Sequence, residues 1–136
     1  MTEKHFQRFG PVLRYDDGDK AIAFLSDAFG FKEHAVHRSP EGQIVHAELE
    51  FKGDYIGLSE RAKGESVGDS IFDLGPCCIY VVLDDGAEID ALCERARAAG
   101  AEIVMEPQDQ EYGSRDFSAR DPENFVWAFG TYRMGS

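Results

Sequence analysis

Large and small side chains alternate near the C-terminal end of the chain, and this alternation is its most distinctive strand signal. The residues are, in order, Phe125, Val126, Trp127, Ala128, Phe129 and Gly130. Successive residues of a strand point to opposite faces of a sheet, so one face is bulky and the other small. The preceding Asp121–Asn124 contains a proline and ends in asparagine, as tight turns do. We predict two antiparallel strands around this turn, with the bulky face in a core.

A second alternation runs through residues 43–51, which we predict to be a strand. Its apolar positions are Val45, Ala47, Leu49 and Phe51, and its polar positions are His46, Glu48 and Glu50. Two stretches show the helical spacing of three and four residues instead. Their apolar positions are Ile22, Leu25 and Phe29 in the first, and Ile89, Leu92, Cys93 and Ala96 in the second. Asp17 and Asp85 are suitable N-caps, and Gly30 and Gly100 are suitable C-terminal stops.

The two halves of the chain repeat one order of elements. The first half predicts a strand at 11–15, a helix from 17 to 29, and strands at 31–38, 43–51 and 55–60. The second half predicts a strand at 77–83, a helix ending before Gly100, and strands at 102–105, 114–120 and 124–132. The tripeptide of residues 16–18, Asp-Asp-Gly, recurs at residues 84–86. We expect one domain, 1–136, with duplicated modules at about 10–60 and 77–132 and a linker at 61–76.

This order predicts an α+β fold in which two βαβββ modules form curled mixed sheets around a cleft. One face of each sheet packs under a helix, and the other faces the cleft. The helix-side positions are expected to be Val45, Ala47, Leu49, Phe51, Ile79, Val81, Trp127 and Phe129. The cleft-side positions are expected to be His46, Glu48, Glu50, Cys78, Tyr80, Val82, Ala128 and Gly130. The small Ala128 and Gly130 should leave room in the cleft.

Composition and charge limit the function classes. The chain is 43% hydrophobic and carries a net charge of −12, from 26 acidic and 14 basic residues. It has no clustered lysine and arginine, so we expect neither nucleic-acid nor membrane partners. The first residues lack the apolar core of a signal peptide, which predicts a cytoplasmic location. The three cysteines form no Cys-x-x-Cys pair, so we expect reduced thiols.

The chain resembles the vicinal oxygen chelate superfamily, the glyoxalase / bleomycin-resistance / extradiol-dioxygenase group. The resemblance covers about residues 10–132 and rests on the duplicated order and four stretches. These are Ala28–Phe31, Tyr112–Arg115, Arg120–Glu123 and Trp127–Tyr132. One difference is that Asn124-Phe125 stands where the family's turn has Gly-Asn. Asparagine tolerates the left-handed backbone, so the turn should form.

The resemblance implies where a divalent metal would be held, with one side chain from each of four strands. These positions fall at about Gly10, Glu48, about Cys78 and Ala128. Only Glu48 is a good ligand for a hard metal ion, and Gly10 and Ala128 supply no ligand. We therefore expect no metal and no cofactor. A shifted site formed by His46, Glu48 and Cys78 is the alternative.

Five residues are the candidate ligand-binding positions: His46, Glu48, Cys78, Tyr80 and Arg120. Glu48 is also the candidate catalytic residue, as a general base whose pKa burial would raise. Its other interpretation is a carboxylate paired with Arg120 or Arg14. Tyr80, with Val82, forms either a stacking wall for a planar ligand or part of the core. Arg120 could hold an anionic ligand.

Three functions fit these observations. The first is a metal-independent small-molecule binding protein of the bleomycin-resistance type, which sequesters a ligand in the cleft. The second is a lyase- or isomerase-type enzyme of the same superfamily, using a residual metal site or Glu48 as base. The third is an interaction module without a ligand. The resemblance also implies a homodimer.

Overall fold

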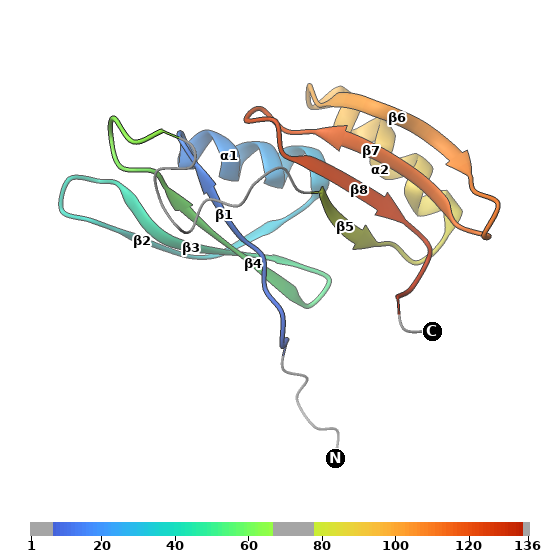
Figure 1. Cartoon of the computed structure of the whole chain (residues 1–136), viewed down its shortest axis with the longest axis horizontal. Coiled ribbons are helices and arrows are strands. Elements are labelled where there is room, and N and C mark those ends of the chain that lie inside the picture. Colours follow the sequence, from blue (N-terminus) through green and yellow to red (C-terminus); the bar gives the residue numbers. More distant parts are fainter. Residues whose placement is uncertain (1–6, 67–77, 135–136) are drawn as a thin grey trace, which may run out of the picture.

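The computed structural model describes residues 7–66 and 78–134 and contains two modules (Figure 1). The elements of the first module are β1 (Val12–Tyr15), α1 (Gly18–Phe24), η1 (Leu25–Phe29), β2 (Lys32–Arg38), β3 (Ile44–Phe51) and β4 (Asp54–Glu60). The elements of the second are β5 (Cys78–Val82), α2 (Gly86–Ala98), β6 (Glu102–Asp109), β7 (Arg115–Arg120) and β8 (Val126–Gly130).

Each module forms one four-stranded mixed sheet. The N-terminal sheet has the order β1-β4-β3-β2, and the C-terminal sheet has the equivalent order β5-β8-β7-β6. In both, the first strand pairs in parallel with the last, and the other pairs are antiparallel. The α+β fold of two βαβββ modules is therefore confirmed, and neither sheet closes into a barrel. That the likeness reflects a duplication, with the expected boundaries, stays a prediction.

The helices begin at the expected caps. The side chain of Asp17 accepts a hydrogen bond from the Lys20 N–H at 3.1 Å, and that of Asp85 accepts one from the Glu88 N–H at 2.9 Å. Gly30 ends the first helical segment with φ 84°, a conformation that glycine adopts without steric cost. The segment differs from a single regular helix because its last turn, η1, is a π-helix.

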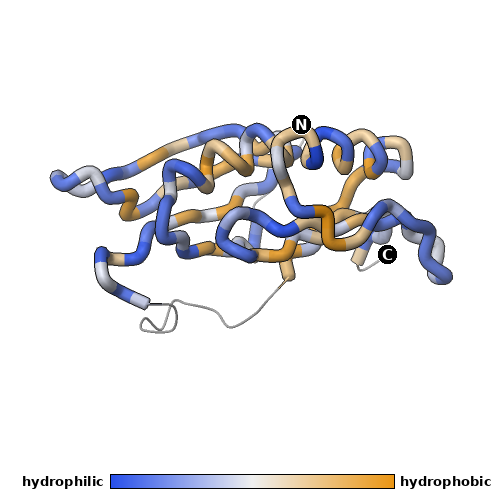
Figure 2. Tube along the Cα trace, turned by 90° about the horizontal axis from the view of Figure 1, so that it is seen from above, coloured by the Kyte–Doolittle hydropathy of each residue, from blue (hydrophilic) through white to orange (hydrophobic). Residues whose placement is uncertain are grey.

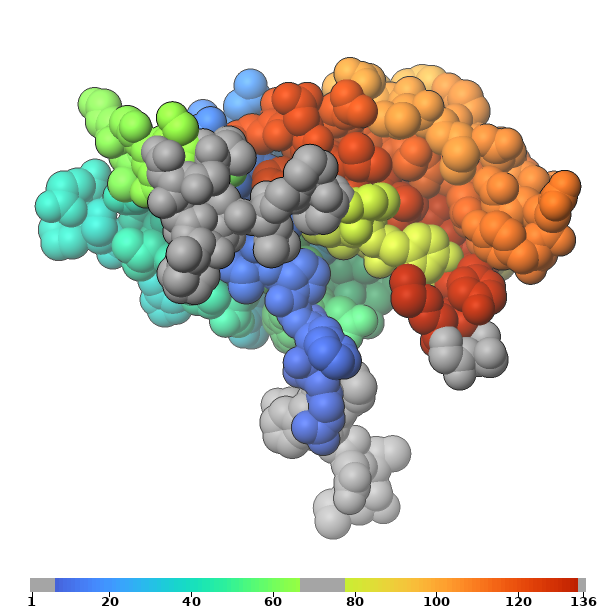
Figure 3. All heavy atoms as spheres, viewed as in Figure 1, coloured from blue at the N-terminus to red at the C-terminus, as the bar shows by residue number. Residues whose placement is uncertain are grey.

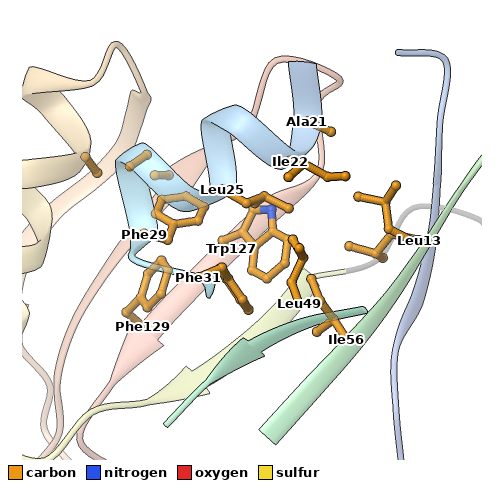
Figure 4. Close-up of a cluster of buried hydrophobic side chains, with 14 of the residues drawn as sticks. Leu13, Ala21, Ile22, Leu25, Phe29, Phe31, Leu49, Ile56, Trp127 and Phe129 are labelled. Atoms are coloured by element: carbon orange, nitrogen blue, oxygen red, sulfur yellow. The ribbon is translucent and has the colours of Figure 1, made fainter. Parts of the chain in front are cut away.

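The core lies where the two modules meet (Figure 4). Trp127 of β8 is fully buried, with its ring centroid 5.6 Å from that of Phe29 and 5.5 Å from that of Phe31. Phe129 lies 4.9 Å from Phe29 in the same cluster. The bulky face predicted for this strand is thus confirmed as core. Most of the hydrophobic segments lie within the helices and strands, whereas the outer loops that connect them are hydrophilic (Figure 2).

Val45 was expected on the helix side of the N-terminal sheet, and this is wrong. Its side chain is 54% exposed, whereas the neighbouring Ile44 is fully buried. His37 pairs with His46 and Arg38 with Ile44, so Val45 is the extra residue of a β-bulge. A bulge shifts the alternation by one residue, which puts Ile44 on the same face as Ala47. Phe51 is only half-buried and packs against Phe31 at 5.2 Å.

Polar contacts also join the modules. The Arg95 guanidinium of α2 donates to the Asp27 and Ser26 carbonyl oxygens at 3.1 and 3.2 Å, at the end of η1. Arg61, in the predicted linker, is buried and lies 3.2 Å from Asp16 and 3.9 Å from Glu123. The linker beyond residue 66 lies outside the described residues. No helix in the described ranges is long and apolar enough to cross a membrane.

Candidate functional site

The predicted cleft-side residues of the N-terminal sheet lie on its open face, the face turned away from α1. His46 and Glu48 follow each other on this face of β3, and His46 Nε2 lies 2.9 Å from Glu48 Oε2. His37 of β2 stacks on His46 with ring centroids 6.2 Å apart. His46, Glu48 and Gly10 line one shallow depression. The face therefore presents a histidine–carboxylate pair to solvent.

The partner of Glu48 is a histidine, which corrects the expectation of an arginine. Arg14 bonds to Glu65 at 2.7 Å, and Arg120 lies 3.7 Å from Glu102. The hydrogen bond from His46 lowers the pKa of Glu48, and the nearby His34 and His37 act in the same direction. A desolvated general base would need a raised pKa. Glu48 is thus held ionised rather than poised to exchange protons near neutral pH.

The other three candidates belong to the C-terminal sheet. Cys78 is exposed at the start of β5, and its Sγ lies 3.9 Å from the Ile79 carbonyl oxygen. Tyr80, half-buried, pairs with Ala128 across β5 and β8. Arg120 stands at the end of β7 with its Nε buried and without a hydrogen bond within the described residues. Arg115, the other arginine of β7, ties the strand to α2, because its guanidinium lies 2.8 Å from Asp90.

A cavity of about 300 Å³ lies at the seam between the modules. It lies between the β3–β4 hairpin, β5 and the segment that leads into β1, which crosses this side of the molecule in blue (Figure 3). Its apolar lining is Phe31, Phe51, Ile56, Ile79, Val81 and Trp127. Tyr80 and Val82 line it too, which supports the stacking-wall interpretation. The five candidates are therefore not gathered in one place: Tyr80 borders this cavity, and His46 and Glu48 border the depression.

The residues present do not fit the metal site that the resemblance implied. Gly10 and Ala128 have no side-chain donor atom, and Cys78 does not line the depression that holds His46 and Glu48. Among residues 7–66 and 78–134, no three His, Cys, Asp or Glu side chains are arranged to hold a metal ion. The shifted site of His46, Glu48 and Cys78 is therefore not assembled within the part of the chain that the structure describes.

The space over Gly130 was expected to be open, and this is wrong. A Cβ placed on Gly130 would collide with the Asp116 carboxylate and the Tyr80 hydroxyl oxygen. Asp116 of β7 was not among the predicted site residues, although its place on the strand opposite Gly130 follows from the sheet register. Because alternate residues of a strand share a face, Asp116 could have been placed on the same face as the candidate Arg120. The sequence alone does not show which residue of β7 stands opposite Gly130.

Comparison with known proteins is consistent with this architecture. The family model described as Glyoxalase/Bleomycin resistance protein/Dioxygenase superfamily matches residues 4–129. The uncharacterized protein Mb0911c of Mycobacterium bovis is 31% identical over 124 residues, 88% of this chain and 80% of that protein. TioX from Micromonospora sp. ML1 is 30% identical with a TM-score of 0.68, over 92% of this chain and 99% of that one. Lactoylglutathione lyase from Agrobacterium tumefaciens shares the fold at 24% identity and a TM-score of 0.67, over 94% of this chain and 95% of that one.

Proposed function

Because the chain belongs to the Glyoxalase/Bleomycin resistance protein/Dioxygenase superfamily, we propose that it is a metal-independent small-molecule binding protein of the bleomycin-resistance-like type. Members of this superfamily bind small molecules and often form dimers. In our proposal the chain sequesters its ligand by non-covalent contacts in the cavity at the seam. Its proposed location is the cytoplasm, where a buried cysteine such as Cys93 stays a free thiol.

The observation that carries the proposal is the seam cavity itself. Small-molecule sites are concave, largely apolar and few per protein, with volumes from roughly 300 Å³ upward. This cavity has that volume, an aromatic and aliphatic lining, and polar groups of Lys52, Asp54 and Tyr55 at its border. Such a site favours a planar, largely apolar molecule with a polar substituent. Gly10 and Ala128, which stand where the resemblance puts two metal ligands, have no side-chain donor, and this supports the metal-independent part of the proposal.

We expect planar aromatic fragments to change the intrinsic fluorescence on binding. Trp127 is the single tryptophan of the chain, and it lies against the cavity. In Ile79→Phe the larger ring fills part of the cavity, so affinity should fall roughly tenfold or more. Val104→Phe is the matched control, because Val104 is 46% exposed on β6 and is not among the residues that line the cavity. Fluorescence titration and a thermal-shift screen provide the measurements.

Two outcomes would contradict this assignment of the cavity. One is that no fragment of a diverse planar library saturates the fluorescence change. The other is that Ile79→Phe and Val104→Phe bind the fragments equally well. A stoichiometric divalent metal in protein purified without added metal would contradict the metal-independent part of the proposal.

A second candidate function rests on the contact between His46 and Glu48. A carboxylate can orient an imidazole for proton transfer, so this pair could serve a lyase- or isomerase-type reaction. NMR spectra of each bound compound, followed over time, separate the two functions. Conversion that Glu48→Gln abolishes would favour the enzyme. Binding without conversion in the wild type would favour sequestration.

The proposed ligand-binding residues are His46, Glu48, Cys78, Tyr80 and Arg120. In one chain they lie on separate surfaces, and a second copy of the chain could bring the open face of one sheet against that of the other. Both open faces expose apolar side chains, with Val12 51% and Val82 36% exposed. Exposed apolar groups and unpaired sheet edges favour association. The homodimer therefore forms part of the proposal.

We expect light scattering after size-exclusion chromatography to give about twice the chain mass of 15.1 kDa. The double variant Val12→Lys with Val82→Lys puts a charge on each open face. It should shift the population toward the monomer, because burying a charge without a partner is costly. A wild-type protein that stays monomeric at concentrations of roughly 100 μM, well above a micromolar dissociation constant, would argue against the dimer.

A further inference from the structure

Asp116 is the least expected charged group on the open face of the C-terminal sheet. The residue is only 9% exposed. Its carboxylate accepts hydrogen bonds from the Ser114 hydroxyl on one oxygen and from the Tyr112 hydroxyl, at 2.8 Å, on the other. Both partners are neutral donors. Neither donor therefore brings a positive charge to balance that of a carboxylate in this sparsely solvated place.

No lysine, arginine or histidine within residues 7–66 and 78–134 forms an ion pair with Asp116. Arg115, the next residue along the strand, points to the opposite face of the sheet and bonds to Asp90 and Asp109. Burying a carboxylate away from water is costly unless a cation or several donors compensate it. The site thus has room in its charge balance for one positive group.

Aromatic rings stand beside this carboxylate. The rings of Tyr112 and Tyr132 lie 5.8 Å apart at an interplanar angle of 86°, which makes two perpendicular walls. Both are accessible, at 63% and 46% exposure. Tyr80 lies on the same side of Gly130 as Asp116, and its hydroxyl donates to the Tyr132 carbonyl oxygen at 2.8 Å. Tyr112 therefore bonds to the carboxylate, Tyr80 lies beside it over Gly130, and the Tyr132 ring packs against that of Tyr112.

The three phenols are suited to bind a cation rather than an anion. The hydrogen bond to Asp116 raises the pKa of Tyr112, and burial raises the pKa of Tyr80. Both rings therefore stay neutral at physiological pH. Neutral aromatic rings attract cations through the negative potential of their faces, and aromatic cages recognise quaternary ammonium groups in this way.

We infer that Asp116, with Tyr80, Tyr112 and Tyr132, binds the cationic head group of the ligand, an alkylammonium or quaternary ammonium ion. The inference rests on the proposed function, because it names the charge of the ligand that the protein sequesters. Tyr80 belongs to both the seam cavity and this site, so one molecule can place an apolar body in the first and a cation at the second. The net charge of −12 attracts such a molecule from solution.

The test compares choline with 3,3-dimethylbutan-1-ol, which has the same shape but a carbon in place of the charged nitrogen. NMR titration should show saturable binding of choline, with shifts of the Tyr112 and Tyr132 ring signals. The alcohol should bind at least roughly tenfold more weakly, because it lacks the charge that the rings and the carboxylate attract.

Three variants locate the contact. Asp116→Asn keeps the shape of the side chain and its acceptor oxygen, and should weaken choline binding roughly tenfold. Tyr132→Leu removes an exposed ring and should weaken choline binding roughly threefold or more. Tyr132→Phe keeps the ring face and should bind choline as the wild type does. The matched control is Glu111→Gln, which removes an exposed carboxylate next to Tyr112 and should change the affinity less than twofold, an effect at the level of a screened surface charge.

Three results would overturn the inference: no choline binding at roughly 10 mM, far above the millimolar constants of weak ligands; equal binding of the alcohol; or unchanged binding in Asp116→Asn. If Asp116→Asn is not folded, as judged by circular dichroism, Tyr132→Leu and Tyr132→Phe decide the question. The Ile79→Phe variant separates this site from the cavity. If the wild type binds no fragment, while both the wild type and Ile79→Phe bind choline, the result would support the cation site and reject the cavity. Fragment binding without choline binding would do the reverse.

Discussion

Asp121→Ala is expected to be among the most destabilising single substitutions in this protein, lowering the free energy of unfolding by about 3–4 kcal/mol. Asp121 is only 4% exposed and lies in the turn before β8. Its Oδ2 accepts hydrogen bonds from the Tyr15 hydroxyl at 2.6 Å and from the Trp127 indole N–H at 3.1 Å. Its Oδ1 accepts from the N–H groups of Glu123 and Phe125 at 3.0 and 3.1 Å. One carboxylate thus holds the turn closed and joins β1 to β8.

The large effect follows from what the substitution leaves behind. In Asp121→Ala the buried indole N–H and phenol lose their acceptor, and each unsatisfied buried group costs roughly 1–3 kcal/mol. Burial, with the charge of Asp121, raises the pKa of Tyr15, so this phenol stays a proton donor across the usual pH range. The two modules would then lose a polar contact at their shared core.

Urea denaturation followed by circular dichroism measures this effect. Tyr15→Phe removes one of the four hydrogen bonds and should cost about 1–2 kcal/mol. Asp109→Ala is the matched control, since the Asp109 side chain is 82% exposed and its ion pair with Arg115 is at the surface. If Asp121→Ala destabilised the protein no more than Asp109→Ala, the proposed role of Asp121 as a link between the modules would be wrong.

Gly130→Ala is the second substitution with a large expected effect, about 2–3 kcal/mol of lost stability. The added methyl group would meet the Asp116 carboxylate and the Tyr80 hydroxyl oxygen directly. Neither group is free to move, because Asp116 is bonded to Ser114 and Tyr112, and Tyr80 to the Tyr132 carbonyl. The methyl group must therefore displace a hydrogen-bonded network rather than a flexible side chain.

The first module offers a matched control for this substitution. Gly57 of β4 pairs with β1 on one side and β3 on the other, as Gly130 of β8 pairs with β5 and β7. A Cβ on Gly57 would meet a Val12 methyl group at 3.2 Å, and Val12 is half-exposed and able to shift. We expect Gly57→Ala to change stability by less than about 1 kcal/mol.

Thermal and urea denaturation of both variants, with choline titration of each, test the expectation. Gly130→Ala should lose both stability and choline binding, whereas Gly57→Ala should keep both. Equal stability of the two variants would show that the space over Gly130 is more adaptable than the contacts of Asp116 and Tyr80 indicate.

Much of the fold could be predicted because its signals are local. The helix caps Asp17 and Asp85 act on backbone groups three residues away, so the sequence shows both partners. Asn124 adopts φ 72° in the predicted turn, again a local conformational preference. Trp127 and Phe129 are buried as their alternation predicted, because period-two spacing directly sets the face of a strand.

The candidate site was less predictable because it depends on distant pairings. Glu48 was expected to meet an arginine and instead meets His46 two positions away on the same face. Val45 lies at the surface because a β-bulge between β3 and β2 shifts the register. No pattern within β3 alone reveals how β3 pairs with β2. The seam cavity combines residues from five separate stretches of the chain, so its shape follows from how the modules pack.

The sequence by itself therefore determined the two βαβββ modules, the faces of most strands and the lack of side-chain donors at Gly10 and Ala128. These depend on local periodicity and on residue chemistry, neither of which needs a partner in space. Only the tertiary structure decided that Asp121 joins the modules and that Asp116 and Tyr80 fill the space over Gly130. The physical reason is that burial and hydrogen bonding of a polar side chain depend on the strand opposite it, and sheet register, not sequence distance, selects that strand.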